Sequence, residues 1–260
     1  MSYLKPVFTI WRREVIRYLR DRARIISTIF QPLMFLLIFG TGLRQTLAQG
    51  NFGVDFLQFM FPGIIAMNVM GVAFFSTVST VWDREFGFLK EILVAPVSRT
   101  SIVMGKVLGA TTIAASQALF LLLLAPFIGL KIHIFVILPL FALMLILSVA
   151  ISGIGLLIAS LMKTTESFGF VMQVLIFPMF FLSGAFFPLT AVPGWMSALS
   201  KINPLTYGVD GMRQIILKSQ ISSEALSKIT LFPIQTDILI LLIISLITIS
   251  AATLAFNRRD

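Results

Sequence analysis

The sequence IFVILPLFALMLILSVAISGIGLLIASLM, residues 134–162, decides the fold class, because it contains no Asp, Glu, Lys, Arg or His. Crossing about 30 Å of hydrocarbon at about 1.5 Å per residue takes roughly 20 apolar residues. This run is long enough for that crossing. It also lacks the polar face that a helix on the surface of a soluble protein would show. A transmembrane helix is therefore predicted here.

The composition of the whole chain extends this prediction. The 260 residues are 58% hydrophobic and 12% charged, which is more apolar side chain than one soluble core of this size can bury. We predict one all-α transmembrane domain over residues 1–260, because lipid-exposed backbone must pair its N–H and C=O groups within each segment. The apolar runs do not alternate with polar residues as the strands of a β-barrel would. The six predicted spans are residues 25–42, 59–81, 107–130, 134–162, 168–187 and 238–256.

The basic residues predict the orientation. The chain has 20 Lys and Arg against 11 Asp and Glu, and six crossings leave 14 of the 20 on the side that holds both termini. Excess positive charge marks the cytoplasmic side, so both termini are expected there. The basic residues flank apolar spans, which favours anionic lipid over nucleic acid as their partner. The basic leader has no small-residue cleavage site, so we expect the first span to remain in the mature protein.

The missing residue types exclude most catalytic classes. The sequence has no Cys, a single His at position 133, and no zinc-protease or nucleophile-elbow motif, so no metal site and no catalytic residues are predicted. It also has no G-x-x-x-x-G-K-[ST] string, so any ATP must be bound by another polypeptide. The spans contain no ionisable residue at depth, which argues against an ion-coupled carrier.

The N-terminal segment, residues 4–24, has the pattern of an amphipathic helix. Large apolar residues such as Trp11 share one side, and the arginines gather on the other. We expect a helix at the membrane interface; the alternative is a solvated basic leader that only enforces topology. The predicted interface residues are Trp11, Arg13, Arg17, Arg20 and Arg24.

Two further segments are candidates for function. The loop at residues 83–99 begins with charged and apolar residues at helical spacing that end at a proline, so it suits docking to another protein, although it could be an ordinary connection. Residues 188–236 predict a pair of short extracellular helices, the first of which could dip back into the outer leaflet as a re-entrant hairpin. Asp210 and Arg213, one turn apart, could form a structural pair at an exposed site. The candidate docking residues are Asp83, Arg84, Glu85, Phe86, Leu89, Lys90, Glu91 and Pro96.

Uncharged polar residues in and beside the spans are candidates for a transport pathway or gate. The alternative is that they form hydrogen bonds between helices or back to their own backbone. Small residues at Gly105 and Gly109, and at Gly153, Gly155 and Ala159, predict close helix packing, within the chain or against a second copy. The pathway and gate candidates are Gln31, Asn68, Ser76, Gln173, Ser183, Trp195 and Tyr207.

Three stretches make the chain resemble the membrane subunits of ABC type-2 exporters. They are WDREFG at residues 82–87 continuing to EILVAPVSR at 91–99, LSGAFFPL at 182–189, and PGW at 193–195 followed by NPLTY at 203–207. With the amphipathic N-terminus and the six spans, the likeness covers essentially the whole chain. The sequence is most similar to the drug-resistance and nodulation-type branch.

The resemblance implies a function and partners. Two permease copies, expected as a homodimer in the inner membrane, would each present the loop from Asp83 to Pro96 as a coupling helix to one of two separate nucleotide-binding subunits. Those subunits would hold ATP and Mg, no cofactor would bind to this chain, and the helices after Pro188 would form an extracellular gate. The expected cargo is lipophilic or amphiphilic, drug-like or lipid-linked. The alternatives are a polysaccharide or lipooligosaccharide permease of the same family, a stand-alone channel or carrier, and a membrane enzyme.

Overall fold

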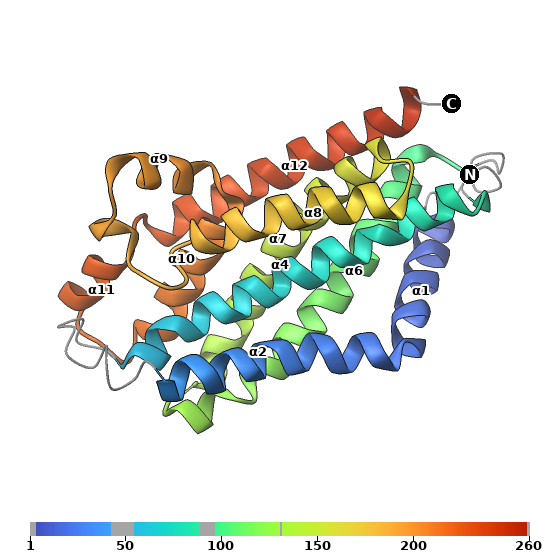
Figure 1. The fold of residues 1–260 in the computed structure, drawn as a ribbon. Helices are drawn as coiled ribbons and strands as arrows, with labels where there is room; N and C mark the ends of the chain where they lie inside the picture. The colour runs from blue at the N-terminus through green and yellow to red at the C-terminus, as the bar shows by residue number, and fades with distance from the viewer. Residues whose placement is uncertain (1–3, 43–54, 89–96, 131, 259–260) are drawn as a thin grey trace.

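The computed structural model describes residues 4–42, 55–88, 97–130 and 132–258. Within these ranges every regular element is a helix, which confirms the all-α prediction. Six long helices run along the length of the molecule, and α1 (Leu4–Arg20) lies across one end, where it packs on α6 (Figure 1). The long helices are α2 (Arg22–Gly42), α4 (Phe56–Glu85), α6 (Arg99–Leu122), α7 (Ile134–Leu161), α8 (Thr165–Phe181) and α12 (Ile234–Arg258).

Four segments of the described chain are long and apolar enough to cross a membrane. They are α4, α6, α7 and the segment Ser223–Phe256, which contains most of α12, while α8 is apolar but has only 17 residues. The outer surface of these helices is apolar too: Leu246 on α12 and Phe170 on α8 are each 70% exposed. Such a surface needs lipid or another protein against it. The membrane class is supported, and the count of six spans stays a prediction.

Two helices differ most from their predicted spans. The third begins at Arg99 instead of residue 107, because the Ser98 side chain caps its first turn by accepting a hydrogen bond from the Ser101 amide. It ends at Leu122, and a short 3₁₀ helix, η1 (Ala125–Ile128), follows. The fifth, α8, ends at Phe181 instead of residue 187, ahead of a turn in which Gly184 has a φ of 78°.

The core surrounds α4, which packs against α2, α6, α7, α8 and α10. Gly155 of α7 allows the close approach to α4, because a Cβ there would lie 2.7 Å from Thr77 Oγ1. Gly153 of the same helix faces Thr248 of α12. The small residues of the fourth predicted span therefore serve packing within the chain.

The segment between α8 and α12 folds into four short elements at the end of the molecule opposite α1 (Figure 1). The longest, α10, is buried against α4, α7 and α12. Asp210 and Arg213 are consequently 4% and 2% exposed, so the prediction of an exposed pair was wrong. The hydrophobic pattern did not reveal that α10 is an interior helix. The four elements are η2 (Leu189–Ala191), α9 (Gly194–Ile202), α10 (Pro204–Leu217) and α11 (Ser223–Ile229).

Candidate coupling site at the end of the bundle

The N-terminal helix α1 packs closely along α6. Gly105 and Gly109 of α6 leave room for it, since a Cβ at either position would lie 2.7 Å from the Cβ of Ile10 or Glu14. The Trp11 indole N–H donates to Thr112 Oγ1 at 3.0 Å. Helix α1 therefore packs against the predicted stripe of small residues, Gly105 and Gly109, and is part of the bundle.

Some arginine side chains of α1 contact other helices, and others are exposed. Arg20 is exposed, whereas Arg13 and Arg17 are only about a third exposed and turn toward α4. Arg24, at the start of α2, donates to Ser76 Oγ at 3.3 Å. The exposed residues of α1 include Leu4, Phe8 and Leu19, an apolar set that suits lipid.

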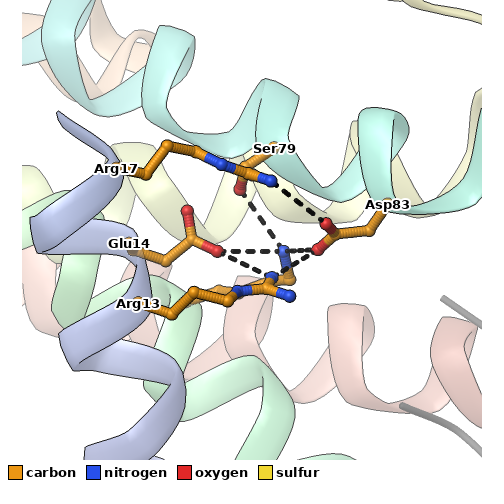
Figure 2. Close-up of polar contacts among 6 residues, drawn as sticks. Arg13, Glu14, Arg17, Ser79 and Asp83 are labelled. Atoms are coloured by element: carbon orange, nitrogen blue, oxygen red, sulfur yellow. Dashed lines mark hydrogen bonds and ion pairs between the residues drawn. The ribbon is translucent and has the colours of Figure 1, made fainter. Parts of the chain in front are cut away.

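The inward-turned arginines belong to a buried group of charged side chains, the ionic cluster: Arg13, Glu14, Arg17, Ser79, Asp83 and Lys106. Figure 2 shows the carboxylates of Glu14 and Asp83 facing one another across the cationic groups. Lys106 Nζ lies 2.7 Å from Asp83 Oδ2 and 3.4 Å from Glu14 Oε1, and it also donates to Ser79 Oγ at 3.3 Å. One ammonium of α6 therefore joins α1 and α4.

Arginine contacts reinforce that junction. Arg13 Nη2 lies 2.5 Å from Asp83 Oδ2 and 3.0 Å from Glu14 Oε1, and Arg17 Nη2 lies 3.7 Å from Asp83 Oδ1. Burial alone would raise the pKa of Glu14, but the charges of Lys106 and Arg13 outweigh it and lower the pKa below its usual value. Glu14 therefore remains ionised, and three cationic groups surround the carboxylates of Glu14 and Asp83.

The last turn of α4 also holds the connection between α7 and α8. Arg84 Nη1 donates to the carbonyls of Ser160 at 2.8 Å and Met162 at 2.5 Å, which the end of α7 leaves without helical partners. Glu85 Oε2 accepts from the backbone N–H of Thr165 at 3.0 Å and from its hydroxyl, at the positive start of α8. We call this pair of contacts the α7–α8 clamp.

Some of the predicted docking residues bond inside the bundle, one is strongly exposed, and the others lie outside the described residues. Asp83 is 1% exposed and bonded inside the bundle, and the side chains of Arg84 and Glu85 bond to α7 and α8. Phe86 is 71% exposed and Phe88, which the sequence did not single out, is 55% exposed. Leu89, Lys90, Glu91 and Pro96, with the predicted coupling helix, lie outside the described residues.

The sequence did not identify Glu14, Ser79 and Lys106 as members of one site. Lys106 was assigned to a loop because the third span was expected to begin after it. A helix start at Ser98 would have placed Lys106 seven residues inside the third helix. A lysine at such a position needs carboxylate partners if its side chain faces the bundle, and this requirement could have pointed to the cluster.

Four of the seven pathway candidates form hydrogen bonds within the chain. Asn68 Nδ2 donates to the Thr28 carbonyl at 3.0 Å, and the hydroxyls of Ser76 and Ser183 donate to backbone carbonyls at 2.7 Å. The Tyr207 hydroxyl donates to the Lys201 carbonyl. The candidates that are exposed are Gln31, Gln173 and Trp195.

Comparison with known proteins decides the family. The sequence profile of the ABC-2 type transporter family matches residues 5–217, a range that includes α1, the ionic cluster and α10. The chain belongs to the ABC-2 type transporter family. ABC-2 proteins similar to it include a putative transport permease ycf38 of Cyanophora paradoxa, which is 31% identical over 94% of this chain and 87% of the relative.

Two bacterial relatives extend the comparison. The inner membrane transport permease YadH of Escherichia coli K12 is 27% identical over 81% of this chain and 82% of YadH. Nodulation protein J of Rhizobium meliloti is 28% identical over 81% of this chain and 80% of that protein. This ABC-2 chain is therefore a multi-pass membrane permease of an ABC transporter, and its family implies an ATP-binding subunit as partner.

Proposed function

We propose that this permease exports a lipophilic or amphiphilic compound, drug-like or lipid-linked, across the inner membrane, driven by ATP and Mg held on separate subunits. In this proposal two copies form a homodimer with two ATP-binding subunits, and both termini are cytoplasmic. The loop at residues 83–96 forms the coupling contact, with Asp83 as its buried base. The observation that carries it is the position of the ionic cluster. Lys106 ties the start of the coupling loop to α1 and α6 in one buried contact.

Coupling requires an element with two arrangements that the partner stabilises differently. Asp83 is too buried to touch a partner, so its role is to fix the base of the loop, while the exposed Phe86 and Phe88 extend from that base. A displacement of the loop would reach α1 and α6 through the ionic cluster, and α7 and α8 through the α7–α8 clamp. The helices after Pro188 would then open as the outer gate.

The hydrogen bonding of the pathway candidates favours a lipophilic cargo over an oligosaccharide. A sugar chain needs many free hydrogen-bonding groups along its route, because every desolvated hydroxyl must be paired. Here Asn68, Ser76 and Ser183 each bond to backbone carbonyls of their own chain. Export of polysaccharide or lipooligosaccharide would require other polar groups.

The experiment is co-expression with the ATP-binding subunit and reconstitution of the complex into vesicles. The permease alone should hydrolyse no ATP, and the complex should move a fluorescent amphiphile outward only with ATP and Mg. Glu85→Lys and, separately, Glu91→Lys should abolish transport. The matched control is Glu166→Lys, because Glu166 is exposed on α8 next to Thr165, the partner of Glu85, and lies outside the proposed gate. Full transport by both coupling-loop variants, or ATP-independent flux, would overturn the proposal.

A further inference from the structure

A second buried group of polar side chains lies at the end of the molecule opposite the ionic cluster. It consists of Asp210, Arg213 and Gln214 of α10 and Asp237 in the first turn of α12, and we call it the α10–α12 cluster. Asp210, Arg213 and Asp237 are 4%, 2% and 0% exposed. Ionisable groups buried inside a membrane protein are costly and commonly mark function.

The two carboxyl groups of this cluster accept different numbers of hydrogen bonds. Asp210 accepts the backbone N–H groups of Leu231 at 2.9 Å and Phe232 at 3.0 Å, so its negative charge is well solvated by the chain. Arg213 donates to the carbonyls of Gly184 at 2.7 Å and Ile229 at 3.3 Å. Its guanidinium lies 4.0 Å from the centre of a phenylalanine ring. Within the described chain, Arg213 forms no ion pair within 4 Å of either carboxylate.

Asp237 receives much less. Its Oδ2 accepts one hydrogen bond, from Gln214 Nε2 at 3.0 Å, while its Oδ1 has no partner among the described residues. The same Gln214 amide lies 3.4 Å from Asp210 Oδ2, so one side chain spans both carboxyl groups. With both acids ionised the cluster would hold two negative charges against one positive charge in a buried site, and one oxygen would have no donor. Such a state is strongly disfavoured.

We propose that the α10–α12 cluster is a proton-binding site, in which the Asp210–Asp237 pair holds one proton on Asp237 and thereby keeps α10 against the start of α12. Asp210 is the ionised member because the backbone N–H groups favour its anion. The titratable groups that face Asp237 are Asp210 and Tyr207, both on α10, and the charged Arg213 of the same helix faces Asp210. The packed helix α7 (Ile134–Leu161) has no titratable side chain. Loss of the proton would place two like charges across the α10–α12 contact and weaken it.

The sign of the effect on stability follows from proton linkage. A carboxyl that stays protonated in the folded state but ionises in the unfolded chain lowers stability as pH rises, starting near the ordinary Asp value of about 3.9. The loss continues until the folded protein also releases the proton, and then stops. Asn reproduces the shape of the protonated acid and cannot ionise. The difference in stability between Asp237→Asn and the parent should therefore grow with pH and then level off.

The test is the thermal unfolding temperature of the full-length permease in detergent, measured from about pH 4 to alkaline pH. Asp237→Asn should match the parent at the acid end and unfold at a higher temperature than the parent at neutral pH. Asp210→Asn should be less stable than the parent at neutral pH, because the amide replaces an ionised acceptor of two N–H groups. A flat difference for Asp237→Asn, or a loss of stability at every pH, would overturn the proposal.

Two further measurements keep the assignment falsifiable. Sodium chloride and choline chloride should stabilise the parent equally at alkaline pH; sodium-specific stabilisation that Asp237→Asn removes would make this a cation site and overturn the proton assignment. If Asp237→Asn does not fold, infrared spectra of the parent decide. A carbonyl band of a buried protonated carboxyl must persist at neutral pH and shift in Asp237→Glu, and absence of that band would refute the proposal.

Discussion

At the residue scale, Lys106 has the most demanding position in the described chain. Its side chain is 2% exposed and depends on the carboxylates of Asp83 and Glu14, which come from other helices. A buried charge tolerates this environment only when oppositely charged groups surround it. The carboxylates in turn depend on Lys106, because it is their fully buried cationic partner, whereas Arg13 and Arg17 are each about a third exposed.

Lys106→Met should therefore destabilise the permease by about 3–5 kcal/mol, the cost of removing one partner from a buried ion pair. Adding Asp83→Asn should cost less than the sum of the two single changes, because neither variant keeps the shared contact. Chemical unfolding in detergent measures both effects. Arg12→Met is the control, since Arg12 is exposed on α1 and should have little effect. Additive losses from the double variant would contradict the shared contact.

The sequence predicted some residues of the ionic cluster but not the contacts between them. It identified Arg13, Arg17 and Asp83 as functional candidates, yet placed the arginines on one surface and Asp83 on another. Their contact joins positions 70 residues apart, and hydrophobic periodicity contains no information on such pairs. Likewise, Asp237 lies four residues after Pro233 and directly before an apolar run. This pattern is typical of the first turn of a helix and does not indicate that the acid is buried.

At the element scale, α1 depends on the glycines of α6. The sequence predicted helices in the right places, because apolar runs of transmembrane length determine where they form. It missed that α1 packs on α6 and that α10 enters the interior. Both helices are amphipathic, and an apolar face is satisfied equally by lipid or by a neighbouring helix. Only the packing partner distinguishes these cases.

Gly109→Ala tests the contact between α1 and α6. A methyl group at this position meets the Glu14 Cβ at 2.7 Å, so α1 must shift and the Glu14 carboxylate must leave Lys106. We expect a loss of about 1–3 kcal/mol in unfolding free energy, the usual cost of overpacking. Gly71→Ala of α4 is the matched control, because its Cβ would meet nothing within 4 Å and alanine is favoured in a helix by up to about 1 kcal/mol. Equal effects of the two changes would exclude a tight α1–α6 contact.

At the scale of the whole molecule, the two buried clusters lie at opposite ends of one bundle. The ionic cluster fixes α1, α4 and α6 to one another with full charges. The α10–α12 cluster depends on a single amide, Gln214, between two carboxyl groups. A junction held by several ion pairs between helices is expected to stay together, whereas a polar contact that depends on one amide hydrogen bond opens more readily. The proposed mechanism therefore has α1, α4 and α6 move together while α10 and α12 separate.

Cross-linking separates these two behaviours, and the absence of native cysteine makes each engineered pair unambiguous. A short thiol cross-linker between Trp11→Cys and Thr112→Cys, whose parent side chains share a 3.0 Å hydrogen bond, should leave ATP-driven transport intact. Gly211→Cys with Asp237→Cys places two Cβ atoms about 3.7 Å apart, which suits a disulfide, and oxidation should stop transport that reduction restores. Transport must be compared with the reduced form of the same double variant, because the substitutions alone alter the contact. Arrest by the α1–α6 link would show that α1 moves relative to α6 during the cycle, and the ionic cluster would then be a contact that breaks in each round of transport.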